Sequence, residues 1–303
     1  MISIQKIRHL SVLAILLTPI ASFSADVDKT LEWVSGGEVK VSITAGRIEF
    51  RGWDRNEVKL DGDYSDDDSR LTFKQSGKNV ILEVKHERSS WWGGGSNSKV
   101  DFVVFTPFES DLDIDGTSLD VEIEGINGNL DIGSISGAVI VNGSDQNNNN
   151  IRADIETVSG DIDIDNTSGK IRLRSVSGDI NSNVNAQTFD AKTVSGDIEG
   201  NIGSTEYASV LSVSGDIDIE LKLEDGARVE GQTVSGNLEL NFKDKVNADF
   251  ELNTGPGGDI RNRLSDDKPD DNNRWGQELD FTLNNGDSTI ELETMSGTIK
   301  LHQ

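Results

Sequence analysis

The stretch Thr157-Val158-Ser159-Gly160-Asp161-Ile162-Asp163-Ile164 recurs along most of this 303-residue chain and decides its fold. From residue 157 to residue 233, successive copies start at intervals of 18, 18, 19 and 21 residues. Such a period is typical of a solenoid, because a unit too small to bury its own apolar face must stack on its neighbours. The further copies begin at Ser134, Ser175, Thr193, Ser212, Thr233 and Thr294.

Stretches of alternating apolar and polar residues flank each copy. Ile151, Ala153 and Ile155 precede the copy at residue 157, and Ile162 and Ile164 lie within it. Alternation with a period of two indicates a half-buried β-strand, and no comparable stretch shows helical spacing. Each interval has room for two strands of roughly six residues and two turns. The sequence therefore predicts an all-β fold, a single-stranded β-solenoid or β-helix with short rungs of about 18–21 residues.

The two turns of each rung differ in how much their length varies from copy to copy. The Ser-Gly corner keeps its length, and we expect Gly160 to supply a backbone conformation that a Cβ would resist. The Thr/Ser columns at the corner are expected to form hydroxyl ladders along the stack. The opposite turn is short at Asn166–Gly169 and long at Asn142–Asn150 and Asn262–Gln277. Insertions that collect at one corner predict one variable edge of the solenoid.

The N-terminus has the pattern of a secretory signal peptide. Lys6 and Arg8 form a charged region, residues 10–20 an apolar core, and small residues surround a cleavage site after Ser24 or Ala25. The apolar core is too short to span a bilayer. The chain has no cysteine, and therefore no lipid-attachment cysteine and no disulfide framework. These features predict a periplasmic or secreted protein.

The chain is strongly acidic, with 54 Asp and Glu against 28 Lys and Arg and a net charge of −26. This balance argues against binding to nucleic acid or to anionic membrane surfaces, and it favours solubility for a repetitive β-protein. On the strand before the corner, the charges would balance between rungs, since Arg172 would lie between Asp154 and Asp190.

The domain organisation that we predict is a signal peptide at residues 1–25 and one β-solenoid domain at residues 26–303. Residues 26–110 form a less regular β-segment that would cap the solenoid, and residues 111–303 hold the regular repeats. Within the cap, residues 39–50 look like one degenerate rung, residues 71–84 like a hairpin, and residues 99–107 like a strand. No Pro- or Ser-rich linker separates the halves.

The chain resembles the bacterial putative-adhesin family of uncharacterised extracytoplasmic β-solenoid proteins. The resemblance rests on the signal peptide, the irregular β-segment ending in Phe105-Thr106-Pro107, and the serial Val-Ser-Gly-Asp-Ile units, and it covers nearly all of the mature chain. It implies a solenoid exported from the cytoplasm. It implies little about activity, because a fold does not fix a function.

Two acidic columns follow the corner glycines. Like charges one rung apart repel by nearly ~1 kcal/mol even in bulk water, so the columns need an offsetting interaction. In one interpretation, the first Asp accepts backbone N–H bonds at its own turn and the second is solvated. In the other, Ca²⁺ bridges the rungs, although the glycine-rich calcium-roll repeat is absent. The candidate metal ligands are Asp161, Asp163, Asp179, Asp197, Glu199, Asp216 and Asp218.

Three tryptophans are candidates for binding a ligand or partner. Trp91 and Trp92 are adjacent in a Gly/Ser-rich segment, so one of them is expected to be exposed, and Trp275 lies in an acidic loop. A loop folded over the end of the solenoid, with the rings partly buried, is the alternative. Exposed rings would suit stacking on a sugar or on a protein partner.

Catalysis has little support in the sequence, and we predict no catalytic residues. The mature chain holds only His86 and His302, neither in a motif, and no carboxylate pair stands out among so many. The expected role is therefore non-enzymatic: an exported binding or scaffold protein of the cell envelope that contacts a surface polymer or an envelope protein. The alternatives are a carbohydrate-active β-helix enzyme and a Ca²⁺-stabilised structural solenoid; otherwise no cofactor is expected.

Overall fold

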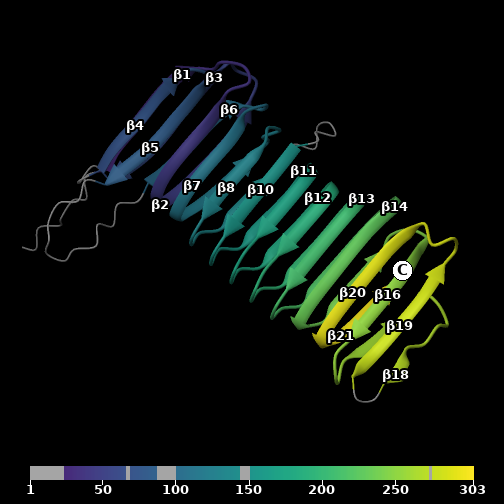
Figure 1. Ribbon diagram of the computed structural model, residues 1–303. Helices are drawn as coiled ribbons and strands as arrows, with labels where there is room; N and C mark the ends of the chain where they lie inside the picture. Colours follow the sequence, from purple (N-terminus) through teal and green to yellow (C-terminus); the bar gives the residue numbers. More distant parts are fainter. Residues whose placement is uncertain (1–23, 66–68, 87–99, 144–150, 273–274) are drawn as a thin grey trace, which may run out of the picture.

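Figure 1 shows the protein as one elongated stack of β-strands. This computed structural model describes residues 24–65, 69–86, 100–143, 151–272 and 275–303. These residues form 21 hydrogen-bonded strands, and no helix occurs among them. The fold class predicted from the repeat is thereby confirmed.

The regular middle of the stack consists of rungs that each contribute one strand to each of two sheets. Strands that precede the Ser-Gly corner form the first sheet, and strands that follow it form the second. Four long strands run from the second sheet through the opposite turn into the first sheet. The middle strands are β10 (Ile151–Thr157), β11 (Ile162–Arg174), β12 (Ile180–Lys192), β13 (Ile198–Ser212), β14 (Ile217–Ser235) and β15 (Leu238–Phe242).

Neighbouring middle rungs pair in parallel and in the register that the repeat predicts. Ile162 pairs with Ile180, Ile180 with Ile198, Ile198 with Ile217, and Ile217 with Leu238. All five side chains are at most 1% exposed, so they form one buried column between the sheets. The core thus sits inside every rung and runs along the whole stack.

The Ser-Gly corners stack through their backbones, which explains the glycine. A Cβ on Gly160 would lie 1.9 Å from the carbonyl oxygen of Gly137 in the preceding rung, and a Cβ on Gly196 would lie 2.1 Å from that of Gly178. The φ angle of Gly160 is not in the left-handed region. Our expectation of an unusual conformation there was wrong, because the glycine is required by the close approach of adjacent rungs.

The inner hydroxyl of each corner is buried and bonds along the stack, as the sequence predicts. Thr193 Oγ1 donates to the carbonyl oxygen of Gly178 (3.2 Å), and Thr233 Oγ1 donates to that of Gly215 (3.3 Å). These bonds give each buried hydroxyl an acceptor in the neighbouring rung.

At the N-terminal end, the first rung in sequence is not the outermost rung in space. Strand β2 lies between β7 on one side and both β5 and β6 on the other, all parallel to it. Antiparallel strands then cover the end: β4 on β5, β3 on β6, and β1 on β3. The strands of this end are β1 (Ser24–Glu32), β2 (Glu38–Trp53), β3 (Glu57–Ser65), β4 (Ser69–Ser76), β5 (Asn79–His86), β6 (Val100–Pro107), β7 (Asp111–Glu124), β8 (Leu130–Ser134) and β9 (Val139–Asn142).

The C-terminal end repeats this arrangement. The last rung in sequence, β20 and β21, inserts between the rung of β14 and β15 and the rung of β16 and β17. Antiparallel β19 covers β16, and β18 pairs with β19. The strands are β16 (Ala248–Thr254), β17 (Asp259–Asn262), β18 (Asp270–Asn272), β19 (Gly276–Leu283), β20 (Ser288–Ser296) and β21 (Thr298–His302). Both ends therefore use an internal segment as the outermost rung.

The described residues contain no helix long and apolar enough to cross a membrane.

Candidate functional site

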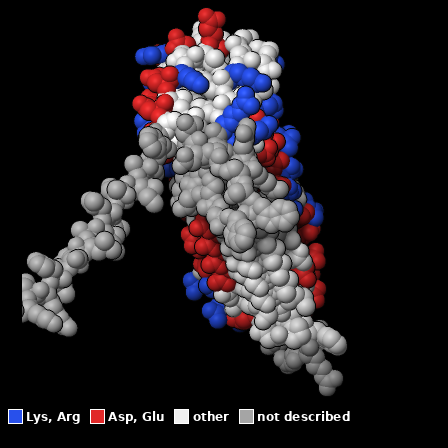
Figure 2. Space-filling model, turned by 90° about the vertical axis from the view of Figure 1, so that its left-hand side faces the viewer, with Lys and Arg blue, Asp and Glu red and all other residues white. Residues whose placement is uncertain are grey.

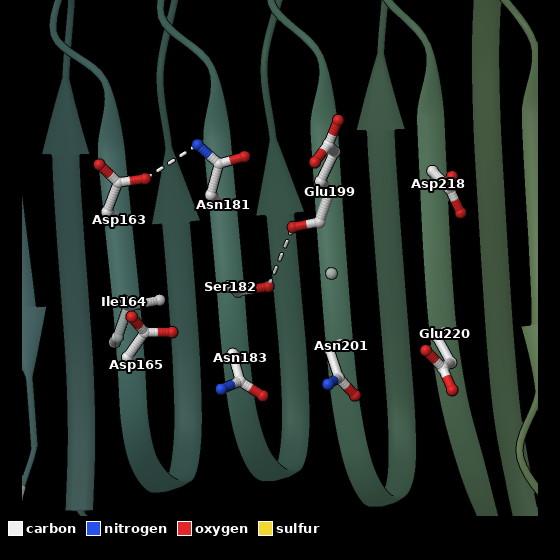
Figure 3. A pocket seen from close by; sticks show the side chains of 11 residues that line it. Asp163, Ile164, Asp165, Asn181, Ser182, Asn183, Glu199, Asn201, Asp218 and Glu220 are labelled. Atoms are coloured by element: carbon white, nitrogen blue, oxygen red, sulfur yellow. Dashed lines mark hydrogen bonds between the residues drawn. The ribbon is translucent and has the colours of Figure 1, made fainter.

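The outer surface of the second sheet carries an open polar trough that crosses four rungs (Figure 3). Its walls are two columns of outward side chains from β11, β12, β13 and β14, and its floor is formed by Ile164, Ser182 and Gly200. Side chains alternate across a strand, so residues two apart present parallel columns on one face. The wall residues are Asp163, Asn181, Glu199 and Asp218 on one side and Asp165, Asn183, Asn201 and Glu220 on the other.

Hydrogen bonds between rungs hold part of the trough in place. Asn181 Nδ2 donates to Asp163 Oδ1 (2.8 Å), and Ser182 Oγ donates to the carbonyl oxygen of Glu199 (3.4 Å). Lys243 Nζ donates to Asn201 Oδ1 at the far end. The trough therefore combines carboxylates, amides and one hydroxyl, which together accept and donate hydrogen bonds.

The electrostatics of the trough are not uniform. Partial burial raises the pKa of Asp218, and the negative charges of Glu239 and Glu199 raise it further. The neighbouring Glu239 accepts a hydrogen bond from Lys300 (2.8 Å), which lowers its pKa. One carboxylate at this end of the column thus has a paired cation, while Asp218 lies among like charges.

The Asp column next to the corner glycines has a structural role. Oδ1 of Asp161 accepts the backbone N–H of Asp179 (3.0 Å), and Oδ1 of Asp179 accepts that of Asp197 (2.9 Å). The same bond continues from Asp197 to Asp216 and from Asp216 to Asn237, both at 2.7 Å. Each carboxylate bonds to the next rung, not to its own turn as one interpretation expected. This ladder offsets the repulsion between the charges.

The outward columns of the first sheet are balanced ion pairs, as predicted. Arg172 lies between Asp154 (3.0 Å) and Asp190 (3.7 Å), and Arg174 pairs with Glu156 (2.6 Å). The Arg174–Glu156 pair is exposed, and such a pair contributes at most ~1 kcal/mol, whereas Asp154 and Asp190 are largely buried.

A row of exposed apolar side chains follows the Ser-Gly edge, and our reading of the sequence missed it. We call it the apolar ridge: Ile135, Val158, Val176, Val194, Val213, Val234 and Met295. The signal was present in the sequence, because alternation from Ile155 places Thr157 inside and Val158 outside. Backbone bonds stack these residues, such as Ser195 N–H to the carbonyl oxygen of Val176 (3.0 Å).

The seven residues predicted as metal ligands are divided between two columns. Asp161, Asp179, Asp197 and Asp216 form the N–H ladder, whereas Asp163, Glu199 and Asp218 line the trough. Among the residues that the structure describes, no three His, Asp or Glu side chains are grouped so that they could hold a metal ion. Calcium binding stays a prediction for experiment.

The three candidate tryptophans do not form one described site. Trp275 is 77% exposed and directly precedes β19 at the C-terminal end, away from the trough. Trp91 and Trp92 lie outside the described residues.

Comparison with known protein families finds a match to the family described as Toastrack DUF4097. It covers residues 108–207 and, in a second overlapping match, residues 182–302, which together are more than half of the chain. The match confirms the resemblance drawn from the repeats. A search of curated proteins finds no match.

Two solved structures are similar to the chain. One is a putative cell adhesion protein from Clostridium sporogenes, with 9% identity, 92% of this chain and 100% of that chain covered, and a TM-score of 0.22. The other is a putative adhesin from Bacteroides fragilis, with 13% identity, 91% and 97% coverage, and a TM-score of 0.46.

Proposed function

We propose that this chain, which belongs to the Toastrack DUF4097 family, is an exported, non-enzymatic binding protein of the bacterial cell envelope. Its ligand would be a hydroxyl-rich polymer, such as an envelope polysaccharide, that lies in the polar trough of the second sheet. The observation that carries this proposal is the repetition of hydrogen-bonding groups at every rung of the trough.

A repeating surface suits a repeating ligand. Adjacent rungs are about 4.8 Å apart, so an extended polymer along the stack would meet a carboxylate or amide at each step. Carboxylates and amides accept and donate hydrogen bonds to sugar hydroxyls. The trough holds five carboxylates in a chain of net charge −26, which disfavours anionic polymers. We therefore expect a neutral or cationic polymer.

A carbohydrate-active enzyme is the alternative that one observation favours. Asp218 has a raised pKa and Glu199 lies in the next rung, which resembles the pairing of an acid with a second carboxylate in glycosidases. The trough is, however, open and regular, whereas catalysis needs groups that converge on one bond. We therefore propose binding, and not hydrolysis, as the function.

The test is sedimentation of the purified protein with insoluble neutral, cationic and anionic polysaccharides. The double substitution Asn183→Ala/Glu220→Ala removes one amide and one carboxylate from the same wall of the trough. It should weaken binding at least tenfold, about 1.4 kcal/mol. The matched control is Gln187→Ala/Glu206→Ala, an exposed, hydrogen-bonded amide and carboxylate outside the trough (3.0 Å). Equal binding by both variants, or binding to no polymer, would contradict the proposal.

Assays for released reducing ends on the same polymers separate binding from hydrolysis. Release that Asp218→Asn abolishes would favour the enzyme instead.

Export is a separate part of the proposal. We infer that residues 26–303 act as one unit after cleavage near Ser24 or Ala25, in the periplasm or outside the cell. Intact-mass measurement of the protein from its native host should show that the first 24 or 25 residues are missing. A retained Met1 would contradict it.

A further inference from the structure

The apolar ridge is the most concentrated exposed apolar feature of the described residues. Eleven large apolar side chains are exposed among them, and seven of these belong to the ridge, each 43–52% exposed. Scattered surface apolar residues need no explanation, but a contiguous row marks an interaction surface. At about 4.8 Å per rung, the six intervals of the ridge span roughly 29 Å.

Below the grey atoms in Figure 2, an uncharged strip runs along the stack, with charged side chains on either side of it. In sequence terms, each ridge residue is followed by an exposed serine, such as Ser177 or Ser195, and then by the corner glycine. The strip is therefore a surface that can lose water without burying a charge.

A groove runs beside the ridge on the side of the first sheet. Its floor is the row of inner hydroxyl residues Thr157, Ser175 and Thr193 with Ser134. One wall is the ridge from Ile135 to Val194, and the remaining lining includes two cations and two carboxylates, Arg174, Lys192, Asp115 and Glu156. Most of the exposed lining of this groove is apolar. A ridge of side chains with the same spacing would fit this groove.

We propose that a second copy of this chain occupies the groove, so that two solenoids pair through their Ser-Gly edges. The ridge of each copy would lie in the groove of the other, around a two-fold axis parallel to the stack. An isologous contact of this kind needs a self-complementary surface, and a ridge with an adjoining groove provides one. Because both ridges have the same rung spacing, each ridge side chain would meet an equivalent position of the groove at every rung.

The charges beside the ridge select this parallel arrangement. On each copy, the first sheet lies on one side of the ridge, and the exposed serines and the Asp column lie on the other. With a two-fold axis along the stack, the Asp column of one copy faces the first sheet of the other copy, at the same level in both stacks. Arg174 and Lys192 are each 40% exposed and pair with Glu156 and Asp190 of their own chain. They would then lie near the exposed Asp179 and Asp197 of the second copy, so this charge-balanced wall, and not a second acidic column, would face the Asp column. An antiparallel pair would instead bring the two Asp columns together, where they would repel.

The test is sedimentation velocity of the purified full protein across a range of micromolar concentrations. The wild type should be a dimer. Val176→Lys/Val194→Lys adds two charges to the ridge at exposed positions and should leave the protein monomeric. Ile140→Lys is the matched control, because Ile140 is 42% exposed but lies on β9, away from the ridge, and it should leave the dimer intact. Circular dichroism checks that each variant is folded.

A monomeric wild type, with the groove empty or occupied by another segment, a peptide or a lipid, would overturn the proposal. So would a dimer that both lysine variants retain.

Cysteine cross-linking tests the orientation, since the chain has no cysteine of its own. With an added oxidant, the parallel pair should form a disulfide-linked dimer through Val194→Cys but not through Ile140→Cys. Ile135→Cys and Met295→Cys lie at opposite ends of the ridge and, when mixed, should not cross-link to each other. A mixed dimer of these two would indicate the antiparallel arrangement and overturn the proposed one.

Discussion

The middle and the two ends of the stack are built from similar rungs but are assembled differently. In the middle, β11, β12, β13 and β14 follow one another in space as they do in sequence. At each end, the terminal rung lies inside the stack, with β2 held between β7 and β5–β6, and β20 held between β14 and β16.

The difference shows that the repeat determines the shape of each rung, but it does not determine which other rungs lie on either side of it. A middle rung depends on two neighbours that are adjacent in sequence, so it can be exchanged or removed. An end rung ties together segments that are far apart in sequence, and antiparallel strands close the edge that would otherwise template aggregation. The middle should therefore tolerate changes of length, and the ends should not.

The largest expected effect is the removal of an inserted rung. Truncation of residues 288–303 removes the buried Ile290, Leu292, Ile299 and Leu301 and leaves β14 and β16 without a common partner. At about 2–5 kcal/mol for each of these four side chains, the summed loss is comparable to the ~5–15 kcal/mol that stabilises a typical fold. The truncated chain should lose its cooperative thermal transition and aggregate.

The matched change in the middle is excision of residues 180–197, one complete rung. It rejoins Asp179 to Ile198 in phase with the repeat and should keep a β-sheet spectrum and one cooperative transition. If β16 instead closes directly on β14 and the truncated chain melts like the wild type, the distinction between ends and middle fails.

The next largest effect concerns the shared core. Ile198→Asp buries an unpaired carboxylate in the isoleucine column, where the side chain is fully buried, and should cost at least ~4 kcal/mol. Chemical denaturation followed by circular dichroism measures the loss. Glu199→Ala, at the outward neighbour, is the control and should change stability by less than ~0.5 kcal/mol. Native stability of Ile198→Asp would disprove the rung register.

The corner glycines should respond alike in both regions. Gly196→Ala in the middle and Gly297→Ala in the inserted rung each place a Cβ within 2.1 Å of a backbone oxygen, so each should lose about 1–3 kcal/mol. Gly226→Ala is the control, because its Cβ meets nothing within 4 Å and only its φ of +75° opposes the change. That should cost about 1–2 kcal/mol. A smaller loss at the corners than at Gly226 would argue against close stacking.

The Asp ladder should contribute less. Asp179→Ala removes the acceptor of the Asp197 N–H and should cost about 1 kcal/mol, measured by urea unfolding. Asp179→Asn keeps an acceptor oxygen and should be near neutral, since Asn237 already donates to this ladder and accepts from Thr298 at the C-terminal end. Equal losses for Ala and Asn would show that the charge itself matters.

The smallest expected effect is that of calcium. Because each ladder carboxylate already accepts an N–H, millimolar CaCl₂ and NaCl of equal ionic strength should shift the melting temperature equally. A site would add RT ln(1 + [L]/Kd), roughly 2.7 kcal/mol at a hundredfold excess of calcium over Kd. A calcium-specific rise that Asp179→Asn/Asp197→Asn abolishes would establish the site.

Most of the rung could be predicted from the sequence, because alternation and a fixed corner are local signals. The isoleucine column, the buried hydroxyls and the ion pairs of the first sheet all follow from stacking equivalent residues. The order of the end rungs could not be predicted, since copies such as those at Thr233 and Thr294 are too similar to specify which neighbour each one takes.

The candidate site was predicted only in part. Asp163, Glu199 and Asp218 were singled out for their charge, but the opposite wall with Asn183 and Glu220 was not, because the trough arises from the spacing of two columns. Each Asp of the ladder accepts an N–H from the next rung and not from its own turn. The residue type alone does not indicate which of the two N–H groups an Asp will accept. The apolar ridge could have been predicted from the alternation of inward and outward residues along each strand, but it was not.

The inserted last rung sets the order in which the molecule can be completed. Segments are synthesised from the N-terminus onward, so β16 and β17 emerge before β20 and β21. The segment from Lys243 to Asn247, which joins β15 to β16, must cross the width of a rung that does not yet exist. Until β20 and β21 are made, β16 and β17 have no parallel partner, because the strands that pair with them are missing. The C-terminal end can therefore take its final strand order only after synthesis of its last two strands, which lie between rungs made before them.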